Sequence, residues 1–457
     1  MEPRLPPLDE LMNLLLDAVC VVDADGRYVY VNAAYERIFG FRADEVIGRP
    51  MIDMVHPDDR ERTLRAACDI MAGETQLNFQ NRYLHKDGRV VHIQWSAHWS
   101  ARDGVRVALG RDVTDVKRAD AIQSALLDIS EAAHAESDLQ SLYGRIHRTV
   151  DRLLPARNCF IALRQSDQDT VEFPYFEDEF DASPGTLPLD APTLSNHVIR
   201  SGEPLLLTPE TRIGLPAHLH PPLGHRATSW LGVPLATPGG VIGALVVQSY
   251  HPTTRYTHQD LQLLQFVSTQ VAAAIERTRS RTWLAFLASH DPLTGLPNRS
   301  HFHEQLHQAL SATQFDRHPL ALLYLDLDGF KAVNDRHGHG VGDQLLREAS
   351  ERIRRCIRHT DTVARLGGDE FVVMLHGTAR AQDAMEVAEA LRESLARPFH
   401  LGGHALAISA SIGVALHADG LANHDGLLQR ADKAMYAAKR QGGNRLVLSG
   451  PRLPSRH

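Results

Sequence analysis

The sequence predicts three mixed helix-and-sheet domains in succession, a multidomain chain of α/β and α+β folds. Its 457 residues correspond to about three domains at roughly 150 residues each. The apolar fraction of 43% and the charged fraction of 23% are typical of globular protein, so each third can bury its own core. The first two thirds read as antiparallel sheets with helices, and the last as a central sheet flanked by helices.

Charge and hydropathy exclude several classes of partner. The net charge of -8 argues against nucleic acid and anionic membrane. The first ten residues, MEPRLPPLDE, lack the basic stretch and apolar core of a signal peptide. The longest apolar runs, such as 241–247, are far shorter than the roughly 20 residues that cross a bilayer. We therefore expect a cytoplasmic protein that binds neither nucleic acid nor membrane.

The first 118 residues alternate between strand and helix patterns. AVCVVDADGRYVYVN reads as two strands joined at an Asp-Gly turn, and RYLHKDGRVVHIQWSAHW as a second hairpin. With the intervening GFRADEVIGRPMIDMVHPDDR and the closing Asp112-Val113-Thr114, these segments resemble a PAS domain. The resemblance implies a sensory domain and leaves open whether it binds haem, flavin or another small molecule.

Two segments are expected to form connecting helices. Apolar residues recur at alternating steps of three and four in each: Ala119, Ile122, Leu126, Ile129 and Ala133, then Leu264, Val267, Val271, Ala274 and Thr278. This is the spacing of a parallel coiled coil, and equally that of an amphipathic helix packed on its own domain. Both alternatives stay open. In the coiled-coil alternative, residues 119–134 form a linker helix, and both helices contact the second chain of a homodimer.

Residues 135–280 resemble a GAF domain. The resemblance rests on ARNCFIALRQSDQDTVEFPYFEDEF, on the strand pair SWLGVPLATPGGVIGALVVQSY and on the closing helix HQDLQLLQFVSTQVAAAIER. It implies a second sensory domain, which binds a small molecule of unknown class or only dimerises.

The last 170 residues carry the strongest signal for chemistry. LALLYLDL, residues 320–327, predicts a buried central strand that ends in Asp326. In RLGGDEF, two glycines predict a tight hairpin turn that carries Asp369 and Glu370. Carboxylates on neighbouring strands can hold two Mg²⁺ ions roughly 4 Å apart, as phosphoryl transfer requires. A solvent-facing acidic turn is the alternative, and the run Gly-Gly-Asp-Glu-Phe favours the metal site.

Five segments in order resemble the GGDEF family of diguanylate cyclases, within a third domain that we place at residues 281–457. They are DPLTGLPNR, LDLDGFKAVNDRHGHGVGD, RLGGDEF, SIGVA and ADKAMYAAKRQGGNRL. The resemblance implies a palm-like, cyclase-type domain that joins two GTP molecules into cyclic di-GMP and releases two pyrophosphates. It also implies a homodimer, because each domain holds one GTP and the two must meet.

The resemblance assigns the catalytic and metal-binding roles to four residues. Asp326, Asp369 and the main-chain carbonyl of Leu327 would hold two Mg²⁺ ions, for which Mn²⁺ could substitute. Glu370 would act in catalysis beside Asp369, by accepting the proton of the attacking 3′-hydroxyl.

Other residues would bind the substrate. Asn334 and Asp343 would hold guanine, since the Asp343 carboxylate can accept from guanine N1–H and its 2-amino group, which speaks against ATP. The main chain at Phe330 and Lys331 would bind the outer phosphates together with Lys439.

Two positions bear on regulation and strength of binding. Arg358 and Asp361 match the R-x-x-D of the family's product-inhibition site, where cyclic di-GMP would bind. Gly443 stands where the family usually has a phosphate-binding arginine, and Arg440 or Arg445 could take its place. The alternative function is therefore a catalytically weak GGDEF protein that acts as a receptor for GTP or cyclic di-GMP.

Overall fold

The computed structural model describes residues 6–135, 138–165, 168–211, 219, 225–316, 319–378, 380–417 and 424–450. The chain divides into two compact units, Met1–Thr278 and Arg279–His457. Within the described ranges, no helix has both the length and the apolar character needed to cross a membrane.

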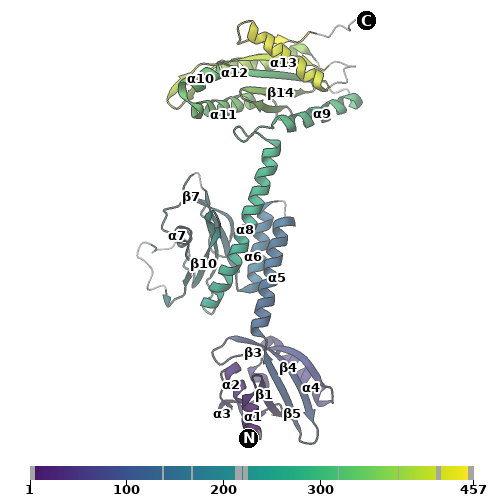
Figure 1. The fold of residues 1–457 in the computed structure, drawn as a ribbon, viewed down its shortest axis with the longest axis vertical. Coiled ribbons are helices and arrows are strands. Elements are labelled where there is room, and N and C mark those ends of the chain that lie inside the picture. Colours follow the sequence, from purple (N-terminus) through teal and green to yellow (C-terminus); the bar gives the residue numbers. More distant parts are fainter. Residues whose placement is uncertain are drawn as a thin grey trace, which may run out of the picture. The chain divides into compact units, whose positions relative to one another are not determined.

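The first domain is a five-stranded antiparallel sheet with short helices against one face (Figure 1). The strand order is β2-β1-β5-β4-β3, so the two predicted hairpins lie at opposite ends of the sheet. Its elements are α1 (Leu8–Leu14), β1 (Ala18–Asp23), β2 (Tyr28–Val31), α2 (Ala33–Phe39), α3 (Ala43–Val46), η1 (Met51–Met54), η2 (Pro57–Asp59), α4 (Arg60–Met71), β3 (Gln76–Leu84), β4 (Val90–Ser100) and β5 (Val105–Asp112).

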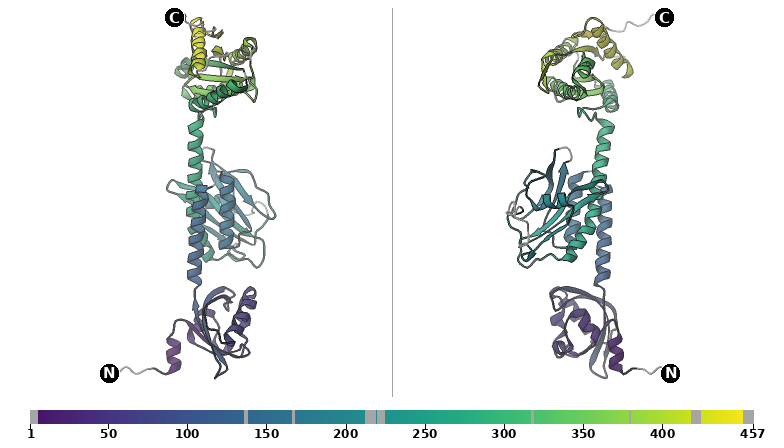
Figure 2. Two further views of the ribbon diagram at one scale, coloured as in Figure 1. Left: turned by 90° about the vertical axis from the view of Figure 1, so that its right-hand side faces the viewer. Right: turned by 60° about the vertical axis from the view of Figure 1, so that its left-hand side comes forward.

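The second domain is a six-stranded antiparallel sheet in the order β8-β7-β6-β11-β10-β9. Helices α5, α6 and α8 lie along one face of this sheet (Figure 2), and α7 packs on the other. Its elements are α5 (Thr114–Ala135), α6 (Leu139–Leu153), β6 (Asn158–Gln165), β7 (Thr170–Glu177), β8 (Thr186–Pro188), α7 (Leu194–Ser201), β9 (Leu205–Leu207), β10 (Ser229–Thr237), β11 (Gly240–Ser249) and α8 (His258–Ser289).

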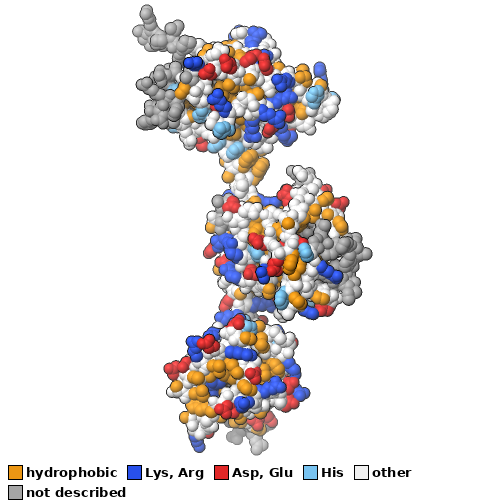
Figure 3. All heavy atoms as spheres, turned by 180° about the vertical axis from the view of Figure 1, so that it is seen from behind, with side chains coloured by type: hydrophobic (Ala, Val, Ile, Leu, Met, Phe, Trp, Pro, Cys, Tyr) orange, Lys and Arg blue, Asp and Glu red, His pale blue; other side chains and the backbone are white. Residues whose placement is uncertain are grey.

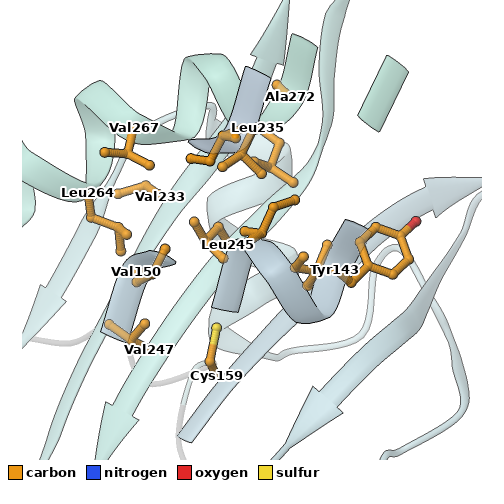
Figure 4. Close-up of a cluster of buried hydrophobic side chains, with 14 of the residues drawn as sticks. Tyr143, Val150, Cys159, Val233, Leu235, Leu245, Val247, Leu264, Val267 and Ala272 are labelled. Carbon is orange, nitrogen blue, oxygen red and sulfur yellow. The ribbon is translucent and has the colours of Figure 1, made fainter. Parts of the chain in front are cut away.

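The proposed coiled-coil seam of α8 is used inside the second domain. The five residues of that seam are at most 4% exposed, and the four apolar ones belong to one cluster with the sheet. In Figure 4, Leu264 and Val267 point toward Val233 of β10. In α5, Ile129 and Ala133 are buried in the same cluster. For α8 the amphipathic alternative therefore holds, because this helix needs its apolar stripe to cover its own sheet. In α5, Ala119 is exposed and Leu126 only half-buried, so a contact of that helix with a second chain stays a prediction.

The third domain is a five-stranded sheet in the order β13-β14-β12-β17-β18, covered on both faces. Helices α11 and α12 pack on one face, and α9 and α13 on the other. Its elements are α9 (Arg299–Asp316), β12 (Leu320–Asp328), α10 (Phe330–His337), α11 (His339–Cys356), β13 (Thr362–Gly367), β14 (Glu370–His376), α12 (Ala381–Ala396), β15 (Phe399–Leu401), β16 (His404–Leu406), β17 (Ser409–Leu416), α13 (His424–Arg440) and β18 (Leu446–Leu448).

Candidate active site

Strand β12 carries Asp326 near the C-terminal end of the central strand. Asp326 stands opposite Glu370 of β14 on one side and opposite Ser411 of β17 on the other. Helices cover both faces of the sheet, which is why LALLYLDL shows an apolar run rather than an alternation. Asp326 as a whole is only 4% exposed at this point.

The two carboxylate oxygens of Asp326 have different environments. Oδ2 is 2.5 Å from the Nζ of Lys439 on α13, whereas Oδ1 is buried and has no hydrogen-bond partner among the described residues. Burial raises the pKa of Asp326 to about 6; Lys439 opposes this shift and the negative charge of Asp369 adds to it. A buried carboxylate oxygen is costly unless a donor or a cation meets it. Asp326 can therefore accept a further cation at Oδ1.

The Gly-Gly-Asp-Glu segment forms the predicted hairpin between β13 and β14. Gly367 pairs with Glu370, so Gly368 and Asp369 make a two-residue turn. The φ angles of Gly367 (145°) and Gly368 (53°) are positive, a conformation that strains residues with a Cβ. The main-chain carbonyl of Asp369 accepts from the N–H of Leu327 at 3.3 Å. The turn is thereby tied to the end of β12.

Arg365 fixes the geometry of this turn. Its Nε and one Nη donate to the carbonyl of Gly368 at 3.0 and 2.7 Å. The other Nη donates to both oxygens of Asp291 at 2.9 and 3.0 Å. Burial works to raise the pKa of Asp291, but hydrogen bonds from Thr294 and Arg365 outweigh it and hold that pKa below its ordinary value. The sequence did not predict this contact, although Asp291 begins the DPLTGLPNR segment and Arg365 begins RLGGDEF.

Glu370 is oriented by a tyrosine of the neighbouring strand. The hydroxyl of Tyr324 donates to Glu370 Oε2 at 2.8 Å, and a guanidinium nitrogen of Arg299 lies 3.9 Å from the same oxygen. Burial and the Glu370 charge raise the pKa of Tyr324 above its ordinary value, so its hydroxyl remains a donor. The sequence signal for Tyr324 was its place two residues before Asp326, on the same face of β12.

Helices α10 and α11 bring Asn334 and Asp343 together. The Oδ1 of Asn334 is buried and accepts no hydrogen bond from the part of the chain that the structure describes. The Asn334 amide lies directly on Gly342, where an added Cβ would be 1.9 Å from Oδ1. Asp343, the next residue, is half-buried on α11. Phe330 and Lys331 form the first turn of α10, whose unpaired N–H groups suit an anion.

Gly443 lies against Asp328, the last residue of β12. The Asp328 carboxylate accepts from Ser409 and Ser411 at 2.7 Å each and from the Asn444 N–H at 2.9 Å. Gly443 has a φ of 72°, and a Cβ there would be 3.1 Å from an Asp328 oxygen. The turn therefore suits glycine, and the guanidinium of the neighbouring Arg445 donates back to the Gly443 carbonyl at 3.2 Å.

Arg358 and Asp361 border a surface pocket of about 520 Å³ before β13. The Asp361 carboxylate accepts from the main-chain N–H groups of Arg358 at 3.0 Å and His376 at 3.1 Å. Asp361 therefore also caps its own turn. Arg354 and His359 border the same pocket and add cationic or neutral donors to it.

No cluster of three or more His, Cys, Asp or Glu side chains suitable for a metal occurs among the described residues. The expected magnesium ligands include only two carboxylates and one carbonyl. Mg²⁺ commonly binds through one or two carboxylates together with substrate phosphates.

Comparison with known proteins identifies each domain. Residues 13–118 match the model of the PAS fold, 136–276 that of the GAF domain, and 288–445 that of the diguanylate cyclase, GGDEF domain. The bifunctional diguanylate cyclase/cyclic di-GMP phosphodiesterase MucR of Pseudomonas aeruginosa is 48% identical over 172 residues, which are 37% of this chain and 25% of MucR. Diguanylate cyclase TpbB of the same species is 44% identical over 174 residues, 37% of this chain and 40% of TpbB.

The chain thus spans less than half the length of these two curated relatives. Among solved structures, the coiled coil and GGDEF domain of DgcB from Caulobacter crescentus, in complex with c-di-GMP, is 30% identical with a TM-score of 0.36. The similarity covers 40% of this chain and 98% of that one. The chain accordingly carries a PAS domain, a GAF domain and a GGDEF domain of the diguanylate cyclase family, in that order.

Proposed function

We propose that this chain is a signal-regulated diguanylate cyclase of the cytoplasm, which converts two GTP into cyclic di-GMP and two pyrophosphates. The observation that carries the proposal is the meeting of Asp326, Asp369 and Glu370 where β12 and β14 pair, with Asp326 Oδ1 buried and unpartnered. The family of residues 288–445 and the c-di-GMP bound by the similar DgcB domain support it.

Asp326, Asp369 and the carbonyl of Leu327 would hold Mg²⁺, or Mn²⁺ in its place. The partnerless Oδ1 fits a hard cation, which prefers carboxylate oxygen. When bound, such ions polarise phosphoryl oxygens and stabilise the attacking and leaving oxygens. Lys439, which now neutralises Asp326, would then be available to pair with the outer phosphates of GTP.

The remaining residues would bind and orient GTP. Asn334 and Asp343 would hold guanine, and the first turn of α10 at Phe330 and Lys331 would hold phosphates. Glu370, positioned by the Tyr324 hydroxyl, would accept the proton of the 3′-hydroxyl. Each 3′-hydroxyl must attack the other GTP, so two domains meet as a homodimer, and the PAS and GAF domains would set how often they meet.

Conversion of GTP in the presence of Mg²⁺ tests the proposal directly. We expect purified protein to produce cyclic di-GMP, and Asp369→Asn to lower kcat/KM by about three orders of magnitude or more, because a metal ligand is lost. Asp383→Asn is the matched control, since Asp383 is exposed on α12, and it should retain full activity. Substantial turnover by Asp369→Asn with unchanged circular dichroism would contradict the metal assignment.

A second candidate function is a receptor that binds GTP or cyclic di-GMP without turnover. The glycine at position 443, where the family usually has a phosphate-binding arginine, favours it. Nucleotide binding by the wild-type protein without any product would establish this function over catalysis.

We also propose product inhibition at Arg358 and Asp361. The Arg358 side chain is exposed and forms no hydrogen bond or ion pair with another described residue, so its fork is free for guanine or phosphate. Arg358→Ala should leave initial rates unchanged and abolish inhibition by added cyclic di-GMP. Arg355→Ala, an exposed arginine one turn earlier on the same segment, should behave as wild type. Equal inhibition of wild type and Arg358→Ala would contradict product binding at this site. Asp361 would then serve only to cap its own turn.

A further inference from the structure

Strand β5 of the PAS domain directs an arginine into the core. Arg106 is 6% exposed and alternates with buried Ala108, whereas Val107 and Leu109 on the outer face are 44% and 38% exposed. When one face of a strand is covered, its large apolar residues normally point into the core. In β5 they point outward instead, so its register is the reverse of the one that its hydrophobic pattern predicts. Gly110 explains this register, because the Trp95 ring lies on it and an added Cβ would be 2.6 Å from that ring.

The Arg106 guanidinium has no counter-charge among the described residues. Its one hydrogen bond there is to the sulfur of Met51, at 2.9 Å, and a thioether is a weak acceptor. A guanidinium has five N–H donors, and burying it without a paired anion is strongly unfavourable. The Arg106 guanidinium therefore lacks a paired anion among the described residues.

A cavity of about 50 Å³ lies where this charge is missing, and Arg106 is one of its walls. The hydroxyl of Tyr28, another wall, is buried close to the hydroxyls of Tyr35 and Tyr83, and no described residue lies within the distance and angle limits of a hydrogen bond to it. Burial and the nearby Tyr83 raise the pKa of Tyr28 well above its ordinary value, so this hydroxyl stays a donor. Most other lining side chains are apolar: Val22, Ala66, Ala67, Ile70, Phe79 and Ala97.

We propose that this cavity binds a short-chain carboxylate of two to four carbons, with its oxygens on Arg106 and Tyr28. The volume accommodates about four water-sized groups, which is enough for acetate; propionate and butyrate need a small outward shift of the lining side chains, and larger metabolites are excluded. Carboxylate geometry matches the two parallel N–H groups of a guanidinium, and the apolar walls suit a short alkyl tail. A dicarboxylate would bring a second charge for which no second buried cation lines the cavity. The PAS domain would then report the level of a small organic acid to the rest of the chain.

Calorimetric titration of the full chain with acetate, propionate and butyrate tests the proposal. Propionate should bind with one site per chain. The neutral isostere propionamide and inorganic nitrate should each bind at least about tenfold more weakly than propionate. Arg106→Met should lower the affinity by about a hundredfold, and Tyr28→Phe, which preserves the packing, by about tenfold. Arg111→Met is the matched control, because Arg111 lies on the same strand, exposed and paired with Asp17. Its affinity should be unchanged.

Thermal unfolding gives an independent readout. Without carboxylate, Arg106→Met should be at least as stable as wild type, because an unpaired buried charge is replaced by an apolar side chain. Propionate should raise the Tm of wild type and leave that of Arg106→Met unchanged. The proposal is overturned if no carboxylate binds wild type, if Arg106→Met binds equally well, if nitrate binds as tightly as propionate, or if Arg106→Met alone is clearly destabilised.

Discussion

Gly342 sets the position of a side chain eight residues before it. The Asn334 amide can lie on α11 only because residue 342 has no Cβ, since one would be 1.9 Å from Oδ1 and 2.9 Å from Cγ. The constraint is one of space rather than of backbone conformation. The buried Oδ1 that results has no partner among the described residues and lies against Gly342, the residue before Asp343, which is the second residue proposed to hold guanine.

Gly342→Ala should raise the KM for GTP by about tenfold or more, because Asn334 must move away from its present position. Gly340→Ala on the same helix is the control, since its added Cβ meets nothing within 4 Å. Both changes add a better helix former, worth roughly 1 kcal/mol, so stability alone cannot produce the difference. Equal KM values for the two variants would show that Asn334 does not contact the base.

At the scale of elements, local patterns predicted the strands and the hairpin but not the contacts between distant segments. The apolar run ending in Asp326 and the turn at Gly368 depend on neighbouring residues, so the sequence displays them. Arg365 and Asp291 are 74 residues apart, and nothing local indicates their pairing. The apolar stripe of α8 was ambiguous, because a helix packed on its own sheet and a helix in a coiled coil show the same spacing.

Arg365→Met should destabilise the GGDEF domain by about 1 to 3 kcal/mol, because Asp291 would stay partly buried without its cation. Cyclic di-GMP synthesis should slow as well, because the Gly368 carbonyl loses both of its Arg365 donors. The turn that carries Asp369 is then no longer held in place by Arg365. Arg347→Met, at an exposed position of α11, is the control and should leave both unchanged.

The pH dependence gives a second check on the pair. Asp291 has a pKa below its ordinary value of 3.8, so its stabilisation is present above that pH and is lost as the pH falls below it. Wild type and Arg365→Met should therefore converge in stability in acid. A constant difference between pH 7 and pH 3 would show that the pair does not stabilise the domain.

At the scale of the whole chain, α8 has two parts of different character. As far as Thr278 one apolar stripe of the helix is buried against the GAF sheet, although Phe266 outside that stripe is exposed, and from Arg279 to Ala285 the helix is largely exposed. Figure 3 shows hydrophobic side chains on the exposed part, where Trp283 and Leu284 are 52% and 65% exposed. Exposed large apolar residues on a helix suit contact with a second copy. The homodimer contact that the sequence suggested for 264–278 is therefore proposed for this segment instead.

Deletions within this exposed segment test whether it transmits a signal through its rotational register. Removing residues 279–285 turns the following helix by only about 20°, whereas removing 279–283 turns it by about 140°. Both deletions remove Trp283, spare the buried part of α8, and shorten the helix by similar lengths, about 10 and 8 Å. If the two GGDEF domains must meet in one orientation, the seven-residue deletion should retain more cyclic di-GMP synthesis than the five-residue deletion, although both variants lose Trp283 of the proposed contact. GTP binding by single chains should be equal in both, because the residues proposed to bind GTP are untouched. Equal synthesis by the two deletion variants would show that this helix acts as a tether of no fixed register.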